Sequence, residues 1–404
     1  MPRPGQGADV NRSAVLAHLG VTGPASRADL ARAIGVSPAL MTAIMKDLVA
    51  DGLVVELETA PSLGGRPARR VGLASSAGRT IGVKVSADHV AFVEVGIDGS
   101  VRRSASEPFD AAARSMLADL TVLLRRFMDS GTTVPLLGIG IGVPGSVDAQ
   151  ASGIVDSVQL GWQQVELGAW LRREFRLPVL VENNVNAVAV AERLYGVGAR
   201  HRDLLVVTIG TGVGSGIVVD GTVLRGATGG AGELGHLPVA EDGPMCDCGN
   251  RGCLETFIGE AALVRIARER GIIPAEGGMV ALRALADGGD AAAAAVFGEA
   301  GHRLGRAIAG TVNLLDPEMI VVLGEGTAAW QHWSFGFEPA LRAALMPRRR
   351  GIGVAVETWQ DESRAQGAAA LVLATPFDSD GVAGEQGRLV RERLAGHVGA
   401  QDPQ

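Results

Sequence analysis

The first 75 residues have the three- to four-residue spacing of apolar positions that predicts short helices. Helices are predicted over residues 11–19, 26–34 and 37–51. The second begins with a capping box, S-R-A-D, that has Asp in place of Glu, and Gly35 ends it. The third has Ser37 as its N-cap and proline in its first position. The last two helices are separated by a tight glycine turn, which is typical of a helix-turn-helix.

A β-type run, LVVELE, follows the third helix, and the basic run RPARRVGL follows a loop. These two runs predict a hairpin wing, so we interpret residues 1–75 as a winged helix-turn-helix that binds double-stranded DNA. Any three-helix subdomain could share the helical pattern, and the wing is what favours DNA. We expect the DNA contacts to come from the third helix and the wing, at Ser37, Ala39, Thr42, Lys46, Arg66, Arg69 and Arg70.

The charge distribution agrees with a DNA-binding head on an acidic body. The chain has 404 residues and a formal net charge of −7. Residues 1–73 carry eight basic and six acidic residues, so the head has a net charge of +2 and the remainder −9. Only two exposed residues of the third helix, Thr42 and Lys46, can hydrogen-bond to bases. One head should therefore bind weakly, and we expect a homodimer or homotetramer on paired half-sites.

Beyond residue 75 the pattern alternates between strands and helices. A β-hairpin is predicted over 80–103 and a helix over 111–128, and strands that end in polar or glycine-rich loops follow. This order predicts α/β layers with a binding site in a crevice. We expect a first lobe over 76–185 and a second over 186–375, with the C-terminal segment 376–404 as a candidate to return to the first lobe.

Composition places the chain among cytoplasmic proteins. Apolar residues make up 47% and charged residues 20% of the sequence. No apolar run reaches the roughly 18 residues of a membrane span, and the N-terminus lacks the apolar core of a signal peptide. All three cysteines lie in one stretch, ELGHLPVAEDGPMCDCGNRGCLE, over residues 233–255. An odd, clustered set of cysteines in a reducing compartment favours a metal over disulfides.

The cysteine spacing C-x-C-x4-C, with a histidine upstream, predicts a closed tetrahedral zinc site made of three thiolates and one imidazole. A site with four protein ligands has no open position for water, so the expected zinc is structural. It would tie the cysteine loop to the GELGH loop. The alternative is a set of buried free thiols.

Several segments together resemble the ROK family, which contains repressors and sugar kinases. They are GIGVPGSVD, VENNVNAVAVAE, TIGTGVGSGIV, GGAGELGHLPV, CDCGNRGCLE and MIVVLGEG, in that order along the chain. The resemblance implies a two-lobed, actin-like hexokinase fold (ribonuclease H-like) behind the winged helix-turn-helix. It also implies the ligand set of the zinc site, which comprises His236, Cys246, Cys248 and Cys253.

By the same resemblance, a sugar in the interlobe cleft would meet Gly145, Asn183, Asn184, Glu233, His236 and Glu255. Carboxylates and amides suit a sugar because they hydrogen-bond to neighbouring hydroxyls. His236 would have two roles, one for each ring nitrogen. Glu255 could instead support the site without touching the sugar.

Two departures from the family's kinases bear on activity. Asn184 stands where those kinases have the aspartate that takes the proton from the sugar hydroxyl, and losing a positioned base costs roughly 10²–10⁴ in rate. Residues 84–88, KVSAD, stand where the kinases have a glycine-rich turn for phosphate and Mg²⁺. The second phosphate loop, TGVGSG at 211–216, is kept, although its glycines could serve a tight hairpin alone.

We therefore predict a sugar-responsive transcriptional regulator, a repressor, that binds a monosaccharide without phosphorylating it and has no catalytic residues. The alternative is an ATP-dependent sugar kinase with residual activity. A further alternative is a regulator that responds to a protein or a phosphosugar. The sequence leaves open which sugar binds and whether the sugar releases or promotes DNA binding.

Overall fold

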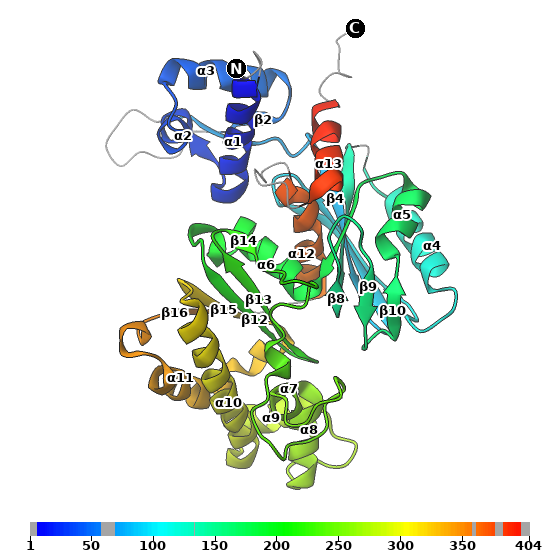
Figure 1. Ribbon diagram of the computed structural model, residues 1–404, viewed down its shortest axis with the longest axis vertical. Coiled ribbons are helices and arrows are strands. Elements are labelled where there is room, and N and C mark those ends of the chain that lie inside the picture. Colours follow the sequence, from blue (N-terminus) through cyan, green and yellow to red (C-terminus); the bar gives the residue numbers. More distant parts are fainter. Residues whose placement is uncertain (1–5, 58–68, 133, 358–360, 376–382, 397–404) are drawn as a thin grey trace. The chain divides into compact units, whose positions relative to one another are not determined.

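The structure is a computed structural model that describes residues 6–57, 69–132, 134–357, 361–375 and 383–396 (Figure 1). The chain divides into two compact units. Unit 1 comprises Met1–Arg200 and Asp361–Gln404, and unit 2 comprises His201–Gln360. These boundaries differ from those expected at 185 and 375. The reason is that helices α6 (Asn184–Tyr195) and α12 (Asp361–Ala374) pack against each other, and α12 covers the sheet of unit 1.

The N-terminal head of unit 1 is a three-helix bundle with a small antiparallel sheet. Its helices are α1 (Gln6–Thr22), α2 (Arg27–Ile34) and α3 (Pro38–Ala50), and its strands, in the order β1-β3-β2, are β1 (Ala25–Ser26), β2 (Val54–Leu57) and β3 (Arg70–Leu73). The side chain of Ser26 accepts a hydrogen bond from the Asp29 N–H, as the capping box predicts. Gly35, in the left-handed region at φ 73°, ends α2.

The body of unit 1 is built on a five-stranded sheet in the order β11-β7-β4-β5-β6. Strands β7 and β11 run parallel to β4, and β5 and β6 form an antiparallel meander with it. The strand bounds are β4 Arg79–Val85, β5 His89–Gly96, β6 Val101–Pro108, β7 Leu136–Val143 and β11 Val179–Asn183. A second small sheet contains β8 (Ser146–Val147), β9 (Val155–Ser157) and β10 (Trp162–Val165).

Helices cover both faces of this sheet. One face packs on α4 (Met116–Asp129) and α5 (Leu167–Phe175) through a core that includes Leu120, Leu124 and Leu171. The other face packs on α12, so closely that a Cβ on Gly140 would lie 1.8 Å from the Ala368 carbonyl oxygen. Only glycine fits there. The remaining helices are η1 (Val197–Arg200) and α13 (Gly384–Gly396).

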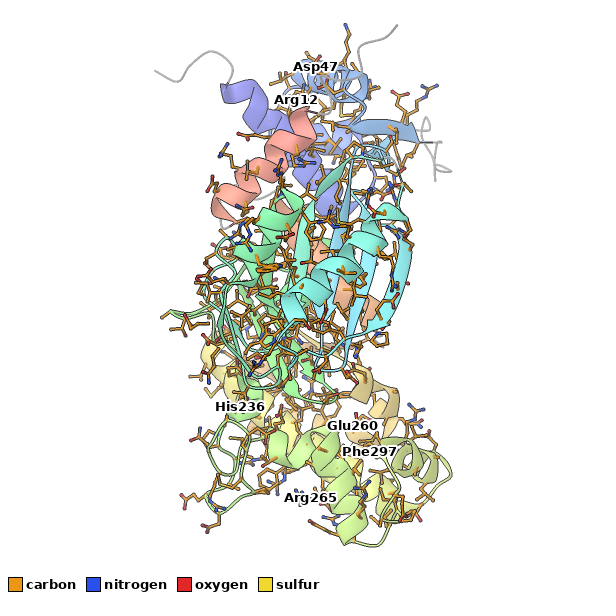
Figure 2. All side chains as sticks on the ribbon, turned by 90° about the vertical axis from the view of Figure 1, so that its right-hand side faces the viewer. Arg12, Asp47, His236, Glu260, Arg265 and Phe297 are labelled. Carbon is orange, nitrogen blue, oxygen red and sulfur yellow. The ribbon has the colours of Figure 1, made fainter. Side chains whose placement is uncertain are left out.

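Unit 2 is a second α/β layer structure. Its sheet has the order β14-β13-β12-β15-β16, with β12 parallel to β15 and antiparallel to β13. The strand bounds are β12 Leu204–Ile209, β13 Val213–Val219, β14 Thr222–Val223, β15 Met319–Leu323 and β16 Gly353–Val356. The long helix α10 (Ala291–Leu315) packs along α11 (Trp330–Ala344). Phe297 on α10 lies in the core of this unit (Figure 2).

The other helices of unit 2 are short. They are η2 (Leu234–His236), α7 (Glu255–Ile258), α8 (Glu260–Glu269), α9 (Met279–Asp287), η3 (Glu325–Ala329) and η4 (Pro347–Arg349). The segment from η2 to α7 carries the cysteines. No single helix in the described ranges is long and apolar enough to cross a membrane, and only the bent pair α2 and α3 meets the length and composition test when the two are joined.

One predicted helix is shorter than expected. The pattern indicated residues 111–128, and α4 begins at Met116. The preceding segment is held by other contacts. The Ala112 N–H donates to the Asp110 carboxylate at 2.9 Å, and the Trp162 indole N–H donates to the Ala111 carbonyl at 2.8 Å. These bonds favour a turn over a first helical turn.

Candidate functional site

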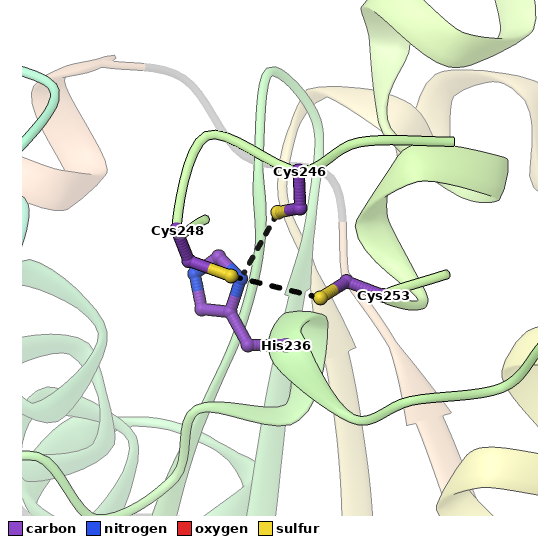
Figure 3. Close-up of side chains that lie close together, drawn as sticks. All are labelled: His236, Cys246, Cys248 and Cys253. Carbon is purple, nitrogen blue, oxygen red and sulfur yellow. Dashed lines mark hydrogen bonds between the residues drawn. The ribbon is translucent and has the colours of Figure 1, made fainter. Parts of the chain in front are cut away.

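The three cysteines and His236 converge in unit 2 (Figure 3). Their ligand atoms all lie within 4.8 Å of one another. The Cys248 and Cys253 sulfurs are 3.6 Å apart, and the Cys246 sulfur is 3.4 Å from Nδ1 of His236. A tetrahedral ion with metal–sulfur bonds of about 2.3 Å has sulfur–sulfur distances of about 3.8 Å. The cluster therefore fits a four-coordinate metal, and three sulfurs with one imidazole suit zinc.

Backbone pairing brings these ligands together without the side chains. Pro238 and Cys253 form a β-bridge, and the Leu254 N–H donates to the Leu237 carbonyl at 2.9 Å. Within the cysteine loop, the Cys246 N–H donates to the Asn250 carbonyl at 2.8 Å. The loop is thus folded onto the segment after His236 by hydrogen bonds of its own.

The thiols differ in their electrostatic surroundings. Burial raises the pKa of Cys246, and raises that of Cys253 to about 12. The backbone N–H of Asn250 lowers the pKa of Cys248. Metal ligation requires the deprotonated sulfur, so a bound cation would favour the thiolate form of all three against the effect of burial.

The two nitrogens of His236 face different groups. Nδ1 lies toward Cys246, whereas Nε2 is 3.8 Å from the Glu233 carboxylate. Partial burial raises the pKa of Glu233, His236 opposes that shift, and Glu255 adds to it. The ring can therefore bind a metal through one nitrogen and take part in a polar site through the other, as the sequence led us to expect.

Glu255 holds the glycine-rich loop of unit 2. It is the first residue of α7, and its Oε2 accepts a hydrogen bond from the Val213 N–H at 2.7 Å. Val213 lies within the TGVGSG loop at 211–216 and begins β13. The observed contact is therefore with the protein backbone, which favours a supporting role for at least one of the two carboxylate oxygens.

In unit 1, Asn183 connects the end of β11 to the start of α6. Its Oδ1 accepts from the Val185 N–H at 2.8 Å, and its Nδ2 donates to the Gly145 carbonyl at 2.8 Å. Gly145 has φ 101°, and a Cβ there would lie 2.3 Å from the Asp156 carbonyl oxygen. Asn183 is therefore an N-cap, and one N–H of its amide remains available for a ligand.

Asn184, the first residue of α6, lies close to a row of charged residues in the sheet of unit 1. Lys84 on β4 and Glu182 on β11 are both in register with Gly142 on the intervening strand β7. Lys84 is 5% exposed and Glu182 is fully buried. A Cβ on Gly142 would lie 3.5 Å from the Asn184 Cα. By the resemblance to the ROK family, Lys84 stands at the strand position where the family's kinases have their first acid.

The turn after Lys84 is a short hairpin connection. The Ser86 N–H donates to the His89 carbonyl, and the Ala87 and Asp88 carbonyls accept from the Ala111 and Phe109 N–H groups. The Asp88 side chain accepts from His89, which lowers the pKa of that carboxyl. Of the turn's backbone groups, these bonds use the Ser86 N–H and the carbonyls of Ala87 and Asp88.

Reasoning from the sequence overlooked the groups around Glu182. Its Oε1 accepts from the Asn183 N–H at 2.8 Å and from the Asn186 amide at 3.3 Å, and its Oε2 accepts from Gln150 at 3.0 Å. A fully buried carboxylate with these partners fixes the β11–α6 junction. The available signal was a lone acid at the end of the apolar run LPVLVE.

Most predicted DNA contacts of the head are exposed. On α3 the Ala39, Thr42 and Lys46 side chains face solvent. The Ser37 hydroxyl caps α3 by accepting from the Leu40 N–H, and the Thr42 hydroxyl donates to the Pro38 carbonyl. Ser37 and Thr42 thus have structural bonds before any DNA contact.

Of the three predicted wing residues, two form contacts within the head and one lies outside the described residues. Arg66 lies outside the described residues. Arg69 forms an ion pair with Glu56, and Arg70 donates to the Pro24 carbonyl. Arg27, which was not among the predicted DNA contacts, forms an ion pair with the same Glu56. Its partner is 29 residues away in the sequence, so local pattern gave no signal for it.

Comparison with known proteins agrees with this architecture. Residues 80–375 match the family described as the ROK family, and residues 9–55 match a winged helix-turn-helix DNA-binding family. The chain is 28% identical to the xylose repressor of Bacillus spizizenii over 316 residues, which is 78% of this chain and 81% of the repressor.

Two solved structures extend the comparison. One is a ROK family transcriptional regulator, a homologue of the E. coli MLC protein, with a TM-score of 0.79 and 26% identity over 96% of this chain and 99% of that one. The other is a ROK family glucokinase from Streptomyces griseus, solved with glucose and AMPPNP, with a TM-score of 0.65 and 27% identity over 73% of this chain and 99% of that one. The predicted two-lobed fold behind a winged helix-turn-helix is confirmed.

Proposed function

Because the chain belongs to the ROK family, we propose that it is a sugar-responsive DNA-binding transcriptional repressor that binds a monosaccharide without phosphorylating it. The observation that carries the proposal is a winged helix-turn-helix match over residues 9–55, in front of a ROK body in which Asn184 stands at the position of the kinases' base. The xylose repressor and the ROK transcriptional regulator support the regulatory part. The glucokinase match covers 73% of this chain, against 96% for the regulator.

The absence of phosphorylation is argued from chemistry at two positions. An amide at Asn184 cannot take a proton from a hydroxyl near neutral pH. Lys84, buried in register with Gly142, provides positive charge where a Mg²⁺–phosphate group would need acid and backbone N–H groups. Each change alone would slow phosphoryl transfer, and together they remove both the base and the first phosphate turn.

We propose sugar-binding polar groups in each unit, taken separately. In unit 2 they are Glu233, the Nε2 face of His236, and Glu255, whose Oε2 also accepts from Val213. In unit 1 they are the remaining amide N–H of Asn183, Asn184 and the backbone near Gly145. Carboxylates accept from sugar hydroxyls and amides donate to them, so the set suits vicinal hydroxyls.

The metal in this proposal is zinc, held by His236, Cys246, Cys248 and Cys253, and its role is structural. Four protein ligands leave no coordination position for a sugar or water. By binding His236 and the cysteine loop together, the ion would hold the His236 ring in the orientation that turns Nε2 toward Glu233. A homodimer or homotetramer would then present two heads to paired half-sites.

A residual sugar kinase is the second candidate. It is favoured by the TGVGSG loop, which Glu255 holds through the Val213 N–H. A coupled assay of ATP consumption over a panel of hexoses and pentoses separates the candidates, run beside calorimetry with the same sugars. We expect a sugar that binds and gives no turnover above background. Sugar-dependent turnover that Glu233→Gln abolishes would overturn the proposal.

A further inference from the structure

Three charged residues meet at one end of the small sheet of the head. Strand β1 ends at Ser26, immediately before Arg27, and β3 begins immediately after Arg69. Both pairings of β3 are antiparallel, and Leu57, at the end of β2, lies opposite Arg70. The end of β1, the start of β3 and the end of β2 therefore lie at the same end of the sheet. Arg27, Glu56 and Arg69 lie at this end.

The contacts make these residues one cluster. Arg27 donates to one Glu56 oxygen at 2.6 Å, and Arg69 donates to the other at 2.8 Å. The side chains are 43% exposed for Arg27, 34% for Glu56 and 75% for Arg69. A cavity of about 340 Å³ lies against them, lined by Ser26, Arg27, Ala28, Glu56 and Arg69.

The cluster is cationic and already oriented. Two guanidinium groups and one carboxylate leave a net charge of +1. Each guanidinium has five N–H donors, and one carboxylate cannot occupy both sets. Because Glu56 holds both arginines, little side-chain entropy remains to be lost when an anion binds. Arginine binds phosphate oxygens through two parallel N–H···O bonds, so a phosphate group fits the donors of this pair.

We propose that Arg27 and Arg69 together bind one phosphate group of the DNA backbone, and that Glu56 attenuates this contact. The inference rests on the proposed DNA-binding function and deepens it. Arg27 belongs to the first helix of the helix-turn-helix and Arg69 to the base of the wing. A shared phosphate contact would fix the position of the head on the duplex independently of sequence.

The test measures the affinity of the full-length protein for a random-sequence duplex of about 30 base pairs as a function of salt. For the wild type, the slope of log K against log[salt] counts the phosphate contacts, at about −0.9 per contact. The variants are Arg27→Ala, Arg69→Ala and the double variant. We expect each single variant to lose about 5- to 10-fold in affinity at low salt.

The double variant distinguishes one shared phosphate from two separate ones. With a shared phosphate, the slope of the double variant is smaller in magnitude than that of the wild type by about 0.9. Its loss of affinity is then smaller than the product of the two single losses. A decrease of about 1.8 in the magnitude of the slope, with an affinity loss equal to the product of the single losses, would mean two independent contacts and would overturn the proposal. Wild-type affinity in both single variants would also overturn it.

Glu56→Gln tests the attenuating role. Glutamine keeps the shape and one acceptor oxygen but removes the negative charge, so the variant should bind the random duplex more tightly than the wild type. Weaker binding by this variant would contradict the attenuation. The matched control is Arg265→Ala, an exposed arginine on α8 of unit 2 that pairs with Glu269 (Figure 2). It removes the same charge from the chain and should leave DNA affinity unchanged.

The outcome also separates this inference from the proposed function. If the wild-type protein binds no duplex DNA even at low salt, the DNA-binding function itself fails and the cluster is a surface ion pair. If the wild type binds and the arginine variants bind equally well, only the phosphate contact fails. Circular dichroism of each variant verifies that the head is folded, which the exposure of the substituted side chains leads us to expect.

Discussion

At the scale of single residues, several polar side chains already have bonds within the protein at the positions where a ligand is expected. Asn183 caps α6 and also donates to Gly145, and Glu255 accepts from Val213. Such bonds orient a side chain before the ligand arrives, which reduces the entropy lost on binding. They also mean that a substitution changes stability together with affinity, so the two must be measured separately.

Asn183 offers a direct measurement of this overlap. Asn183→Ala should shift the urea unfolding midpoint downward, with a loss of about 1–2 kcal/mol, because the start of α6 loses its cap. Asn183→Ser keeps a capping oxygen and loses only the bond to the Gly145 carbonyl, so its loss should be smaller. Equal losses in the two variants would show that the cap contributes nothing. Calorimetry with a bound sugar then gives the change in affinity separately.

Tyr195 differs from these residues because its buried hydroxyl forms no hydrogen bond with the described residues. Burial raises the pKa of Tyr195, and its hydroxyl has no hydrogen-bond partner among the described residues. A buried unpaired hydroxyl costs about 1–3 kcal/mol. Tyr195→Phe should therefore leave the free energy of unfolding unchanged or raise it by about 1 kcal/mol. Its ring packs against Gly99, so Tyr195→Ala should lower it by about 3–5 kcal/mol. A large loss in Tyr195→Phe would reveal a hydrogen bond to that hydroxyl.

At the scale of elements, short backbone pairings determine where the functional groups lie. The bridge between Pro238 and Cys253 folds the cysteine loop back toward His236. The hydrogen bond from Val213 to Glu255 joins the glycine-rich loop to α7. Each contact is within unit 2, and each joins segments that are distant in the sequence. The cysteine loop and the segment after His236 therefore form one hydrogen-bonded element.

Removal of the metal should affect more than the cysteines. Cys248→Ser, or chelation of the wild type, should lower the zinc content from about one to less than half an atom per chain. The affinity for sugar should fall as well, because His236 loses the ion that orients it. Elemental analysis and calorimetry on the same samples measure both. The matched control is Asp247→Asn, in the same loop and exposed, which should retain metal and affinity. Full sugar affinity in the metal-free protein would contradict the proposal that the metal orients His236 for sugar binding.

At the scale of the whole molecule, unit 1 joins the head to a helix that carries sugar-binding candidates. Asn183 and Asn184 lie at the start of α6, and the same helix packs against α1 of the head. A ligand that moves α6 would therefore act on an element in contact with the DNA-binding head. Such coupling requires different sugar affinities in the DNA-bound and DNA-free states.

Thermodynamic linkage makes the coupling testable without knowing its direction. If the sugar changes the affinity for operator DNA by some factor, operator DNA must change the affinity for the sugar by the same factor. Factors of about 5–150 are typical of regulatory proteins. Calorimetry of each ligand in the presence of the other measures both. A sugar that binds and leaves DNA affinity unchanged for the protein's own operator would contradict the regulatory proposal.

The sequence by itself determined the local chemistry of this protein. The capping box at Ser26, the N-cap Ser37 and the spacing of the three cysteines are short-range patterns, and each acts within a few residues. Their meaning therefore survives without knowledge of the fold. The resemblance of the motifs to the ROK family added the two-lobed architecture and the expectation that His236 is the fourth ligand, which spacing alone left open.

Only the tertiary structure decided which distant residues meet. Lys84 and Glu182 lie on either side of Gly142 because of the register of three parallel strands. Arg27 and Arg69 share Glu56 because the antiparallel pairing places the termini of three strands at one end of the sheet. The period of apolar positions fixes which face a side chain takes, but strand register depends on packing across the whole sheet. For that reason the partners of these charged residues could not be read from the chain.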